Sequence, residues 1–166
     1  MIRLTVFSIP LAAAMLIGCS PVSPAPPALA PAAPTVVASP LLDDVRILSG
    51  DDMQGRDTGS EGGERARAYI VSRLEAMGVQ PAPFGRLQPF QAPGRTREGV
   101  KRFNGVNIVG LIPGARVADR YIVVTAHYDH VGVNDGQIYH GADDNASGVA
   151  TMLELARRLK ANPPEH

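Results

Sequence analysis

Hydrophobic positions recur along the chain with the periods of two kinds of element. Between 41 and 77 they return every three or four residues, which predicts two helices. The first would run from Leu41 to Ser49, where Gly50 ends it. The second would begin with Ser60 as its N-cap and stop at Gly78. Its apolar face would consist of Ala66, Tyr69, Ile70, Leu74 and Met77.

The pattern then changes to short apolar runs between turn residues, which predicts strands. Residues 84–90 (FGRLQPF) suggest a short edge strand and residues 104–114 (NGVNIVGLIPG) a second strand. The run from 121 to 126 is continuously apolar, which is typical of a central strand covered on both faces. A last helix would follow Ser147. We therefore predict an α/β fold, a layered α/β domain.

Composition adds few constraints. The 166 residues include 16 basic and 16 acidic side chains, and 45% are hydrophobic, which suits one globular domain with additional segments. Because the net charge is zero, nothing in the composition favours a nucleic-acid partner.

The first forty residues have the features of an export signal and a tether. Arg3 precedes an apolar segment from Leu4 to Ile17, which is too short to span a bilayer as a helix. The following LIGCS sequence resembles the lipobox of bacterial lipoproteins, which implies cleavage before Cys19 and lipid attachment to its thiol. We predict a signal peptide over 1–18 and a Pro/Ala-rich tether over 19–40. The domain over 41–166 would then be exported and lipid-anchored to the bacterial cell envelope, at the outer membrane and facing the periplasm or the exterior.

Two clusters of polar residues lie where ligands bind in α/β sheets. His127 and Asp129 follow the apolar run and point to the same side of an extended chain, so the carboxylate can accept the spare imidazole N–H. Asp143 and Asp144 lie between glycines just before the last helix, and two adjacent carboxylates favour a cation. Each cluster alone has an ordinary explanation. His127 could be a surface residue, and Asp144 or Asn145 could cap the helix while Asp143 is solvated.

Together, the segments TAHYDHVG (125–132) and IYHGADDNASGVATMLELAR (138–157) closely resemble the metal-binding core of the M28 family of zinc aminopeptidases. The preceding GRDTGSEGGERARAYI (55–70) matches the same family. The resemblance implies that His127 binds one zinc ion, that Asp129 orients it as part of the catalytic machinery, and that Asp143 bridges two zinc ions. It also implies a cis peptide bond between Asp143 and Asp144. His130 and His140 match no ligand position and are interpreted as rim or hydrogen-bonding residues.

The resemblance implies that residues 41–166 are the N-terminal part of a zinc-peptidase-like domain, a partial three-layer α/β/α fold that is incomplete at its C-terminus. It further implies a two-zinc aminopeptidase that hydrolyses peptide or aminoacyl substrates. The family's general base and remaining ligands match no residues of this sequence, so we expect the 166-residue chain alone to be an inactive fragment that binds zinc weakly. Two alternatives stay open. One is a lipoprotein binding module without catalysis, and the other is a glutaminyl cyclase with a single zinc ion on a similar scaffold.

Overall fold

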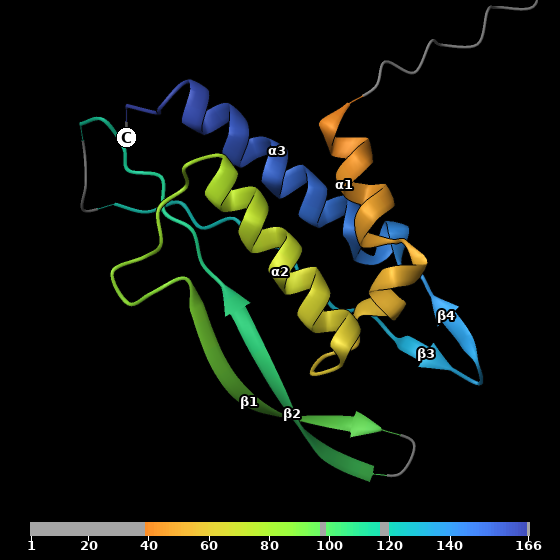
Figure 1. The fold of residues 1–166 in the computed structure, drawn as a ribbon. Coiled ribbons are helices and arrows are strands. Elements are labelled where there is room, and N and C mark those ends of the chain that lie inside the picture. The colour runs from red at the N-terminus through yellow and green to blue at the C-terminus, as the bar shows by residue number, and fades with distance from the viewer. Residues whose placement is uncertain (1–38, 97–98, 117–119, 166) are drawn as a thin grey trace, which may run out of the picture. The chain divides into compact units, whose positions relative to one another are not determined.

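The computed structural model describes residues 39–96, 99–116 and 120–165 (Figure 1). The predicted signal peptide, Cys19 and the tether up to residue 38 lie outside the described residues. Within the described part of the chain, no helix is both long and apolar enough to span a membrane.

Three α-helices enclose the hydrophobic core of the fold. They are α1 (Pro40–Leu48), α2 (Glu61–Ala76) and α3 (Ser147–Ala161), and α3 packs against both of the others (Figure 1). All three helices were predicted from the apolar period and are confirmed. The Oγ atom of Ser60 accepts a hydrogen bond from the Gly63 amide at 3.2 Å, which is the expected N-cap of α2. After α2, Gly78 adopts a φ of 66°, a conformation that favours glycine at a helix end.

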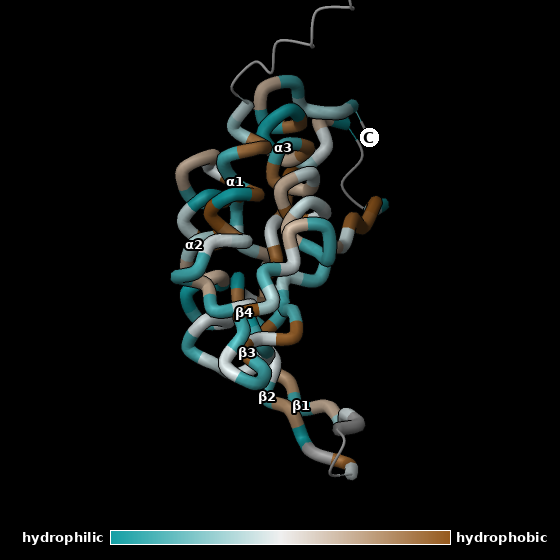
Figure 2. Tube along the Cα trace, turned by 90° about the vertical axis from the view of Figure 1, so that its right-hand side faces the viewer, coloured by the Kyte–Doolittle hydropathy of each residue, from teal (hydrophilic) through white to brown (hydrophobic). Residues whose placement is uncertain are grey.

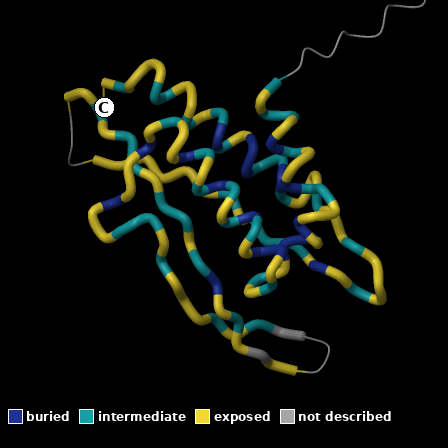
Figure 3. The backbone as a smooth tube through the Cα atoms, viewed as in Figure 1, coloured by how far each residue is buried: buried dark blue, intermediate teal, exposed yellow. Residues whose placement is uncertain are grey.

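The hydrophobic core lies between these helices. Buried residues gather on their facing sides, whereas the strands that extend away from the helices are mostly exposed or half-buried (Figure 3). The apolar faces predicted for α2 and α3 supply most of the core, so the amphipathic pattern is confirmed. Its buried members are Leu48, Met53, Ala66, Ile70, Leu74, Val79, Ala146, Val149 and Leu153.

The longer of two hairpins joins β1 (Leu87–Thr96) to β2 (Gly99–Ile108) in antiparallel register, with Leu87 opposite Ile108. Both strands were predicted, but their bounds were not: β1 extends beyond residue 90 and β2 begins at 99 rather than at 104. Pro89 and Pro93 lie within β1, and a strand at the edge of a sheet tolerates proline.

The shorter hairpin joins β3 (Gly132–Asn134) to β4 (Gln137–Tyr139), a stretch predicted only as part of a long loop. Its two turn residues, Asp135 and Gly136, have φ values of 50° and 76°, which are typical of a type I′ turn. The hairpin contacts the 3-10 helix η1 (Asp51–Arg56).

The predicted central strand over 121–126 is not formed within the described residues. The segment is extended but pairs with none of the described strands. It is hydrophobic (Figure 2), yet the side chains of Ile122 and Val123 are 91% and 79% exposed. A strand forms only when a neighbouring strand satisfies its backbone groups, and β1 and β2 pair only with each other. The mixed α/β content of the fold is confirmed, while the described strands form two separate antiparallel pairs.

Candidate metal centre

His127 lies at the end of the extended apolar segment, as predicted, with its imidazole half-exposed. Its Nδ1 atom is 3.2 Å from the backbone oxygen of Asp129 and 3.4 Å from the carboxylate atom Oδ1 of the same residue. The structure therefore brings His127 and Asp129 together. An Nδ1 atom held in this way leaves Nε2 as the ring atom available to a metal ion.

The carboxylate that faces Nε2 belongs to Asp144 and not to Asp143. Asp144 Oδ1 lies 3.3 Å from His127 Nε2. For Asp143, the described contact is made by its backbone oxygen, which accepts a hydrogen bond from Ser147 Oγ at 2.9 Å. The two aspartates share the π-helical turn η2 (Ala142–Ala146), in which Asp144 has the non-helical dihedral angles φ −115° and ψ 90°. The assignment of Asp143 as the metal ligand stays a prediction, and the geometry places its neighbour opposite His127.

The backbone of this turn also differs from the expectation. The cis peptide bond lies between Asp144 and Asn145, one residue later than the resemblance implied. Neither residue caps α3, because that helix begins at Ser147 without a side-chain cap. Asn145 Nδ2 instead donates to the backbone oxygen of His127 at 3.2 Å. The loop before α3 is therefore bound to the His127 segment.

The two other histidines of this region differ in exposure, since His130 is mostly buried and His140 is half-exposed. His130 Nδ1 is 3.4 Å from Asp144 Oδ2, and the side chain of His130 is 15% exposed. His140 lies farther out, with Nδ1 3.0 Å from the backbone oxygen of Ser49. His130 thus supports the Asp144 carboxylate from the side opposite His127.

Two residues that hold these segments, Thr58 and Arg56, were not predicted from the sequence. Thr58 Oγ1 donates to Asp129 Oδ2 at 2.8 Å. Arg56 is buried and donates to backbone oxygens on both sides of the site, including Tyr128 and Gly141, each at 2.8 Å. Both residues come from the GRDTGS segment, which the sequence showed only as a turn-rich loop. A lone arginine or threonine in such a loop carries no periodic signal that would reveal its partners.

Burial and charge act in opposite directions on Arg56. Removal from water lowers the pKa of its guanidinium group, while the nearby carboxylates of Asp129 and Asp144 raise it. Tyr128, which lies between the ligand segments and β2, has a raised pKa mainly because of burial. Its hydroxyl donates to the backbone oxygen of Val106 at 2.9 Å. The site therefore consists of the buried Arg56 and the partly buried Tyr128 next to the more exposed side chains of His127 and Asp144.

Imidazole nitrogen and carboxylate oxygen are donors that suit zinc. Among the described residues, however, no three His, Cys, Asp or Glu side chains converge as a complete metal site would require. His127 and Asp144 form a facing pair of candidate ligands, with Asp129 and His130 beside them.

Comparison with known proteins shows which family the C-terminal part of the chain resembles. The model of peptidase family M28 matches residues 107–166, the stretch that contains both ligand segments and α3. Residues 107–166 are therefore similar to peptidase family M28. The match confirms the resemblance seen in the sequence.

Curated relatives of this chain include two kinds of enzyme. The glutaminyl-peptide cyclotransferase of Boiga irregularis is 36% identical over 107 residues, covering 63% of this chain and 27% of that protein. Aminopeptidase YwaD of Bacillus subtilis (strain 168) is 43% identical over 60 residues, or 36% of this chain and 12% of that protein. The chain thus spans 27% of the length of the cyclotransferase that it matches.

A solved structure shows the same fold. The crystal structure of Macrostomum lignano glutaminyl cyclase superimposes with a TM-score of 0.50 at 23% sequence identity, over 77% of this chain and 35% of that one. At this identity the likeness concerns the fold alone, and it supports the predicted zinc-peptidase-like α/β class.

Proposed function

We propose that the protein is a zinc-dependent metallopeptidase of the aminopeptidase type, with His127 and Asp144 among its metal ligands. The observation that carries the proposal is the 3.3 Å approach of His127 Nε2 to Asp144 Oδ1, together with Asp129 beside Nδ1. A histidine whose second nitrogen is bonded to a carboxylate or carbonyl is the usual form of a zinc-binding histidine. Similarity to peptidase family M28 supports a hydrolytic reaction.

Each residue of the site has a role in this proposal. Asp129, bonded by Thr58, fixes the imidazole of His127 so that Nε2 points toward the Asp144 carboxylate. His130 fixes the other oxygen of Asp144. When bound, two zinc ions would supply an activated water near neutral pH and a Lewis acid for the scissile carbonyl. Because zinc usually takes about four ligands, the proposal requires further ligands besides His127 and Asp144.

A second candidate function is glutaminyl cyclisation. It is favoured by a specific observation, the 36% identity with a glutaminyl-peptide cyclotransferase over 63% of the chain. The two reactions differ in their product. An aminopeptidase releases a free N-terminal amino acid from a peptide, whereas a cyclase converts an N-terminal glutamine into a ring without adding water.

The decisive experiment offers the purified full-length protein both kinds of peptide in the presence of zinc. We expect release of the N-terminal residue from an unblocked peptide, and loss of that release after treatment with a chelator and in H127A. Conversion of an N-terminal Gln peptide to its cyclic form, without release of an amino acid, would establish the second candidate instead. Stoichiometric zinc binding without either product would refute both and support a binding module.

The location of the protein is part of the proposal. We infer that Cys19 carries a lipid that anchors the protein to the bacterial envelope, on the strength of the LIGCS sequence after an apolar segment. Stable anchoring requires more than one acyl chain, because each buried methylene contributes only about 0.8 kcal/mol. Metabolic labelling with a radioactive fatty acid should mark the wild-type protein and not C19A. Equal labelling of both would refute the anchor.

A further inference from the structure

Arg56 is the largest side chain in the fold that is almost completely buried, with 1% of its surface exposed. Its guanidinium donates only to backbone oxygens in the described contacts. Nε donates to Tyr128 and Nη2 to Gly141, each at 2.8 Å, while Nη1 donates to His140 at 2.8 Å and to Leu48. One planar group thus connects the end of α1 with two separate loops.

These two loops carry the proposed metal ligands. Tyr128 directly follows His127, and Gly141 lies three residues before Asp144. The main chain of Arg56 adds a further link, because its oxygen accepts a hydrogen bond from the amide of His130 at 3.3 Å. Both ligand segments are therefore hydrogen-bonded to Arg56. The first is bonded to its side chain through Tyr128 and to its main chain through His130, and the second is bonded to its side chain through Gly141.

We propose that Arg56 is a positioning residue that fixes the separation between the His127 and Asp144 side chains and so tunes the affinity of the site for zinc. This inference rests on the metal site proposed above. Arg56 contacts neither ligand side chain, so its effect passes through the backbone oxygens that it binds. Partners outside the ligands themselves commonly change metal affinity about 10- to 100-fold.

The backbone around Arg56 is fixed in an uncommon conformation. Gln54, Gly55 and Arg56 all have positive φ values, of 45°, 66° and 53°. For a residue other than glycine, such a conformation costs about 1 to 3 kcal/mol and persists only where the surroundings enforce it. At Gly55 a Cβ atom would lie 2.4 Å from the backbone oxygen of Gly132 and 2.6 Å from that of Tyr139. The turn therefore presses against β3 and β4, which limits how far the guanidinium can move.

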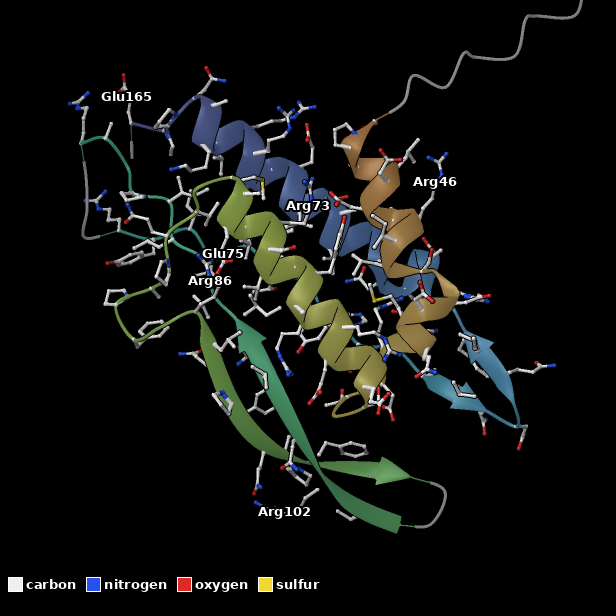
Figure 4. The ribbon with its side chains drawn as sticks, in the orientation of Figure 1. Arg46, Arg73, Glu75, Arg86, Arg102 and Glu165 are labelled. Atoms are coloured by element: carbon white, nitrogen blue, oxygen red, sulfur yellow. The ribbon has the colours of Figure 1, made fainter. Side chains whose placement is uncertain are left out.

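Lysine cannot replace this group. Its ammonium keeps the positive charge near Asp129 and Asp144, but it is a compact point charge and cannot reach carbonyls on three segments at once. R56K therefore separates the geometric role from the charge. A matched control exists in Arg86, which also donates to two backbone oxygens, those of Val79 at 2.5 Å and Val109 at 3.4 Å. Arg86 lies just before β1, far from the β3–β4 hairpin (Figure 4).

The test measures zinc affinity by competition with a chromogenic chelator in the full-length wild type, R56K, R86K and D144N. We expect R56K to bind zinc about 10- to 100-fold more weakly than wild type, and R86K to bind as wild type does even if both variants melt at lower temperature. If R56K binds zinc as tightly as the wild type does, the positioning role of Arg56 is refuted, whereas the proposed metal site is not. A wild type that binds no zinc, or whose affinity is unchanged in D144N, would refute the metal site itself and with it this inference.

A measurement on the wild type covers the case in which R56K does not fold. The Nε–H of Arg56 should exchange slowly with solvent, and its NMR signal should shift when zinc is added, because the ligand loops are bonded to it. The Nε–H of Arg86 serves as the internal reference and should not shift. A zinc-saturated protein in which the Arg56 signal stays in place would overturn the inference.

Discussion

The Nε2 atom of His127 lies 3.3 Å from Oδ1 of Asp144, although the β3–β4 hairpin separates the two residues in sequence. Several contacts outside the pair hold this arrangement. Asn145 Nδ2 donates to the backbone oxygen of His127, and Thr58 donates to the Asp129 carboxylate beside the ring. The pair is therefore part of a bonded framework of loops and is not an isolated surface contact.

A buried carboxylate on α1 connects this helix to α2. Asp44 is 2% exposed, receives a hydrogen bond from Tyr69, and is 2.8 Å from Arg73 Nε. Removing it would leave both donors without their acceptor. We expect D44A to lower the free energy of unfolding by about 2 to 3 kcal/mol, because hydrogen bonds to charged groups are worth about 1.5 to 3 kcal/mol.

Urea unfolding followed by circular dichroism measures this loss. The control is R46Q, which removes an ion pair with Asp43 whose side chains are 70% and 60% exposed, and Arg46 lies on the outside of α1 (Figure 4). Such surface pairs contribute between about 0 and 1 kcal/mol. A D44A variant as stable as R46Q would show that the buried group does not join the helices.

The contact between η1 and the β3–β4 hairpin should be sensitive to one added methyl group. In G55A the new Cβ would meet two backbone oxygens, whereas in G136A nothing lies within 4 Å of it. Both positions have positive φ, 66° and 76°, so both variants share the backbone strain of about 1 to 2 kcal/mol. We expect G55A to lose clearly more stability, since overpacking adds about 1 to 3 kcal/mol. Equal melting temperatures of the two variants would contradict the close approach.

Glu154 on α3 gives a prediction for pH. Arg157 and Arg158 each donate to its carboxylate at 2.7 Å and lower the pKa of Glu154 from 4.5 to about 2. Because the pKa of Glu154 is lower in the folded state than in the unfolded state, its ionised carboxylate stabilises the fold at pH values above about 4.5. This contribution disappears as the pH falls from about 4.5 towards 2. Carbon NMR should show Glu154 titrating near 2 in the wild type, and near its ordinary value in a variant with glutamine at 157 and 158. An ordinary pKa of Glu154 in the wild type would refute the ion pairs with Arg157 and Arg158.

Local features were predictable from the sequence because their causes are local. The apolar period located α1, α2 and α3, and the polar side chain of Ser60 located the start of α2. The prediction of a strand over 121–126 was wrong, because a strand forms only beside a partner strand, and an apolar sequence does not by itself provide one. The Asp135–Gly136 pair, a recognised hairpin signal, would have revealed β3 and β4.

The proximity of His127 and Asp129 was predictable from the sequence, whereas the assignment of Asp143 as a metal ligand stays a prediction. Sequence placed His127 and Asp129 correctly beside each other, because alternate residues of an extended chain share a side. The resemblance assigned the bridging role to Asp143, but which aspartate faces His127 depends on the dihedral angles of the η2 turn, which begins after Gly141 in a left-handed conformation. The role of Arg56 was not predicted, because its hydrogen-bond partners are backbone oxygens, which cannot be recognised in the sequence.

The central claim is that the His127 and Asp144 side chains bind zinc. Zinc titration of full-length wild type, D144N and D143N by isothermal calorimetry tests it most directly. We expect D144N to weaken binding more than the roughly 10- to 100-fold loss typical of residues outside the ligand set. D143N should weaken binding about fivefold or less, because an exposed charge contributes up to about 1 kcal/mol. Loss of zinc binding in D143N with normal binding in D144N would contradict the account.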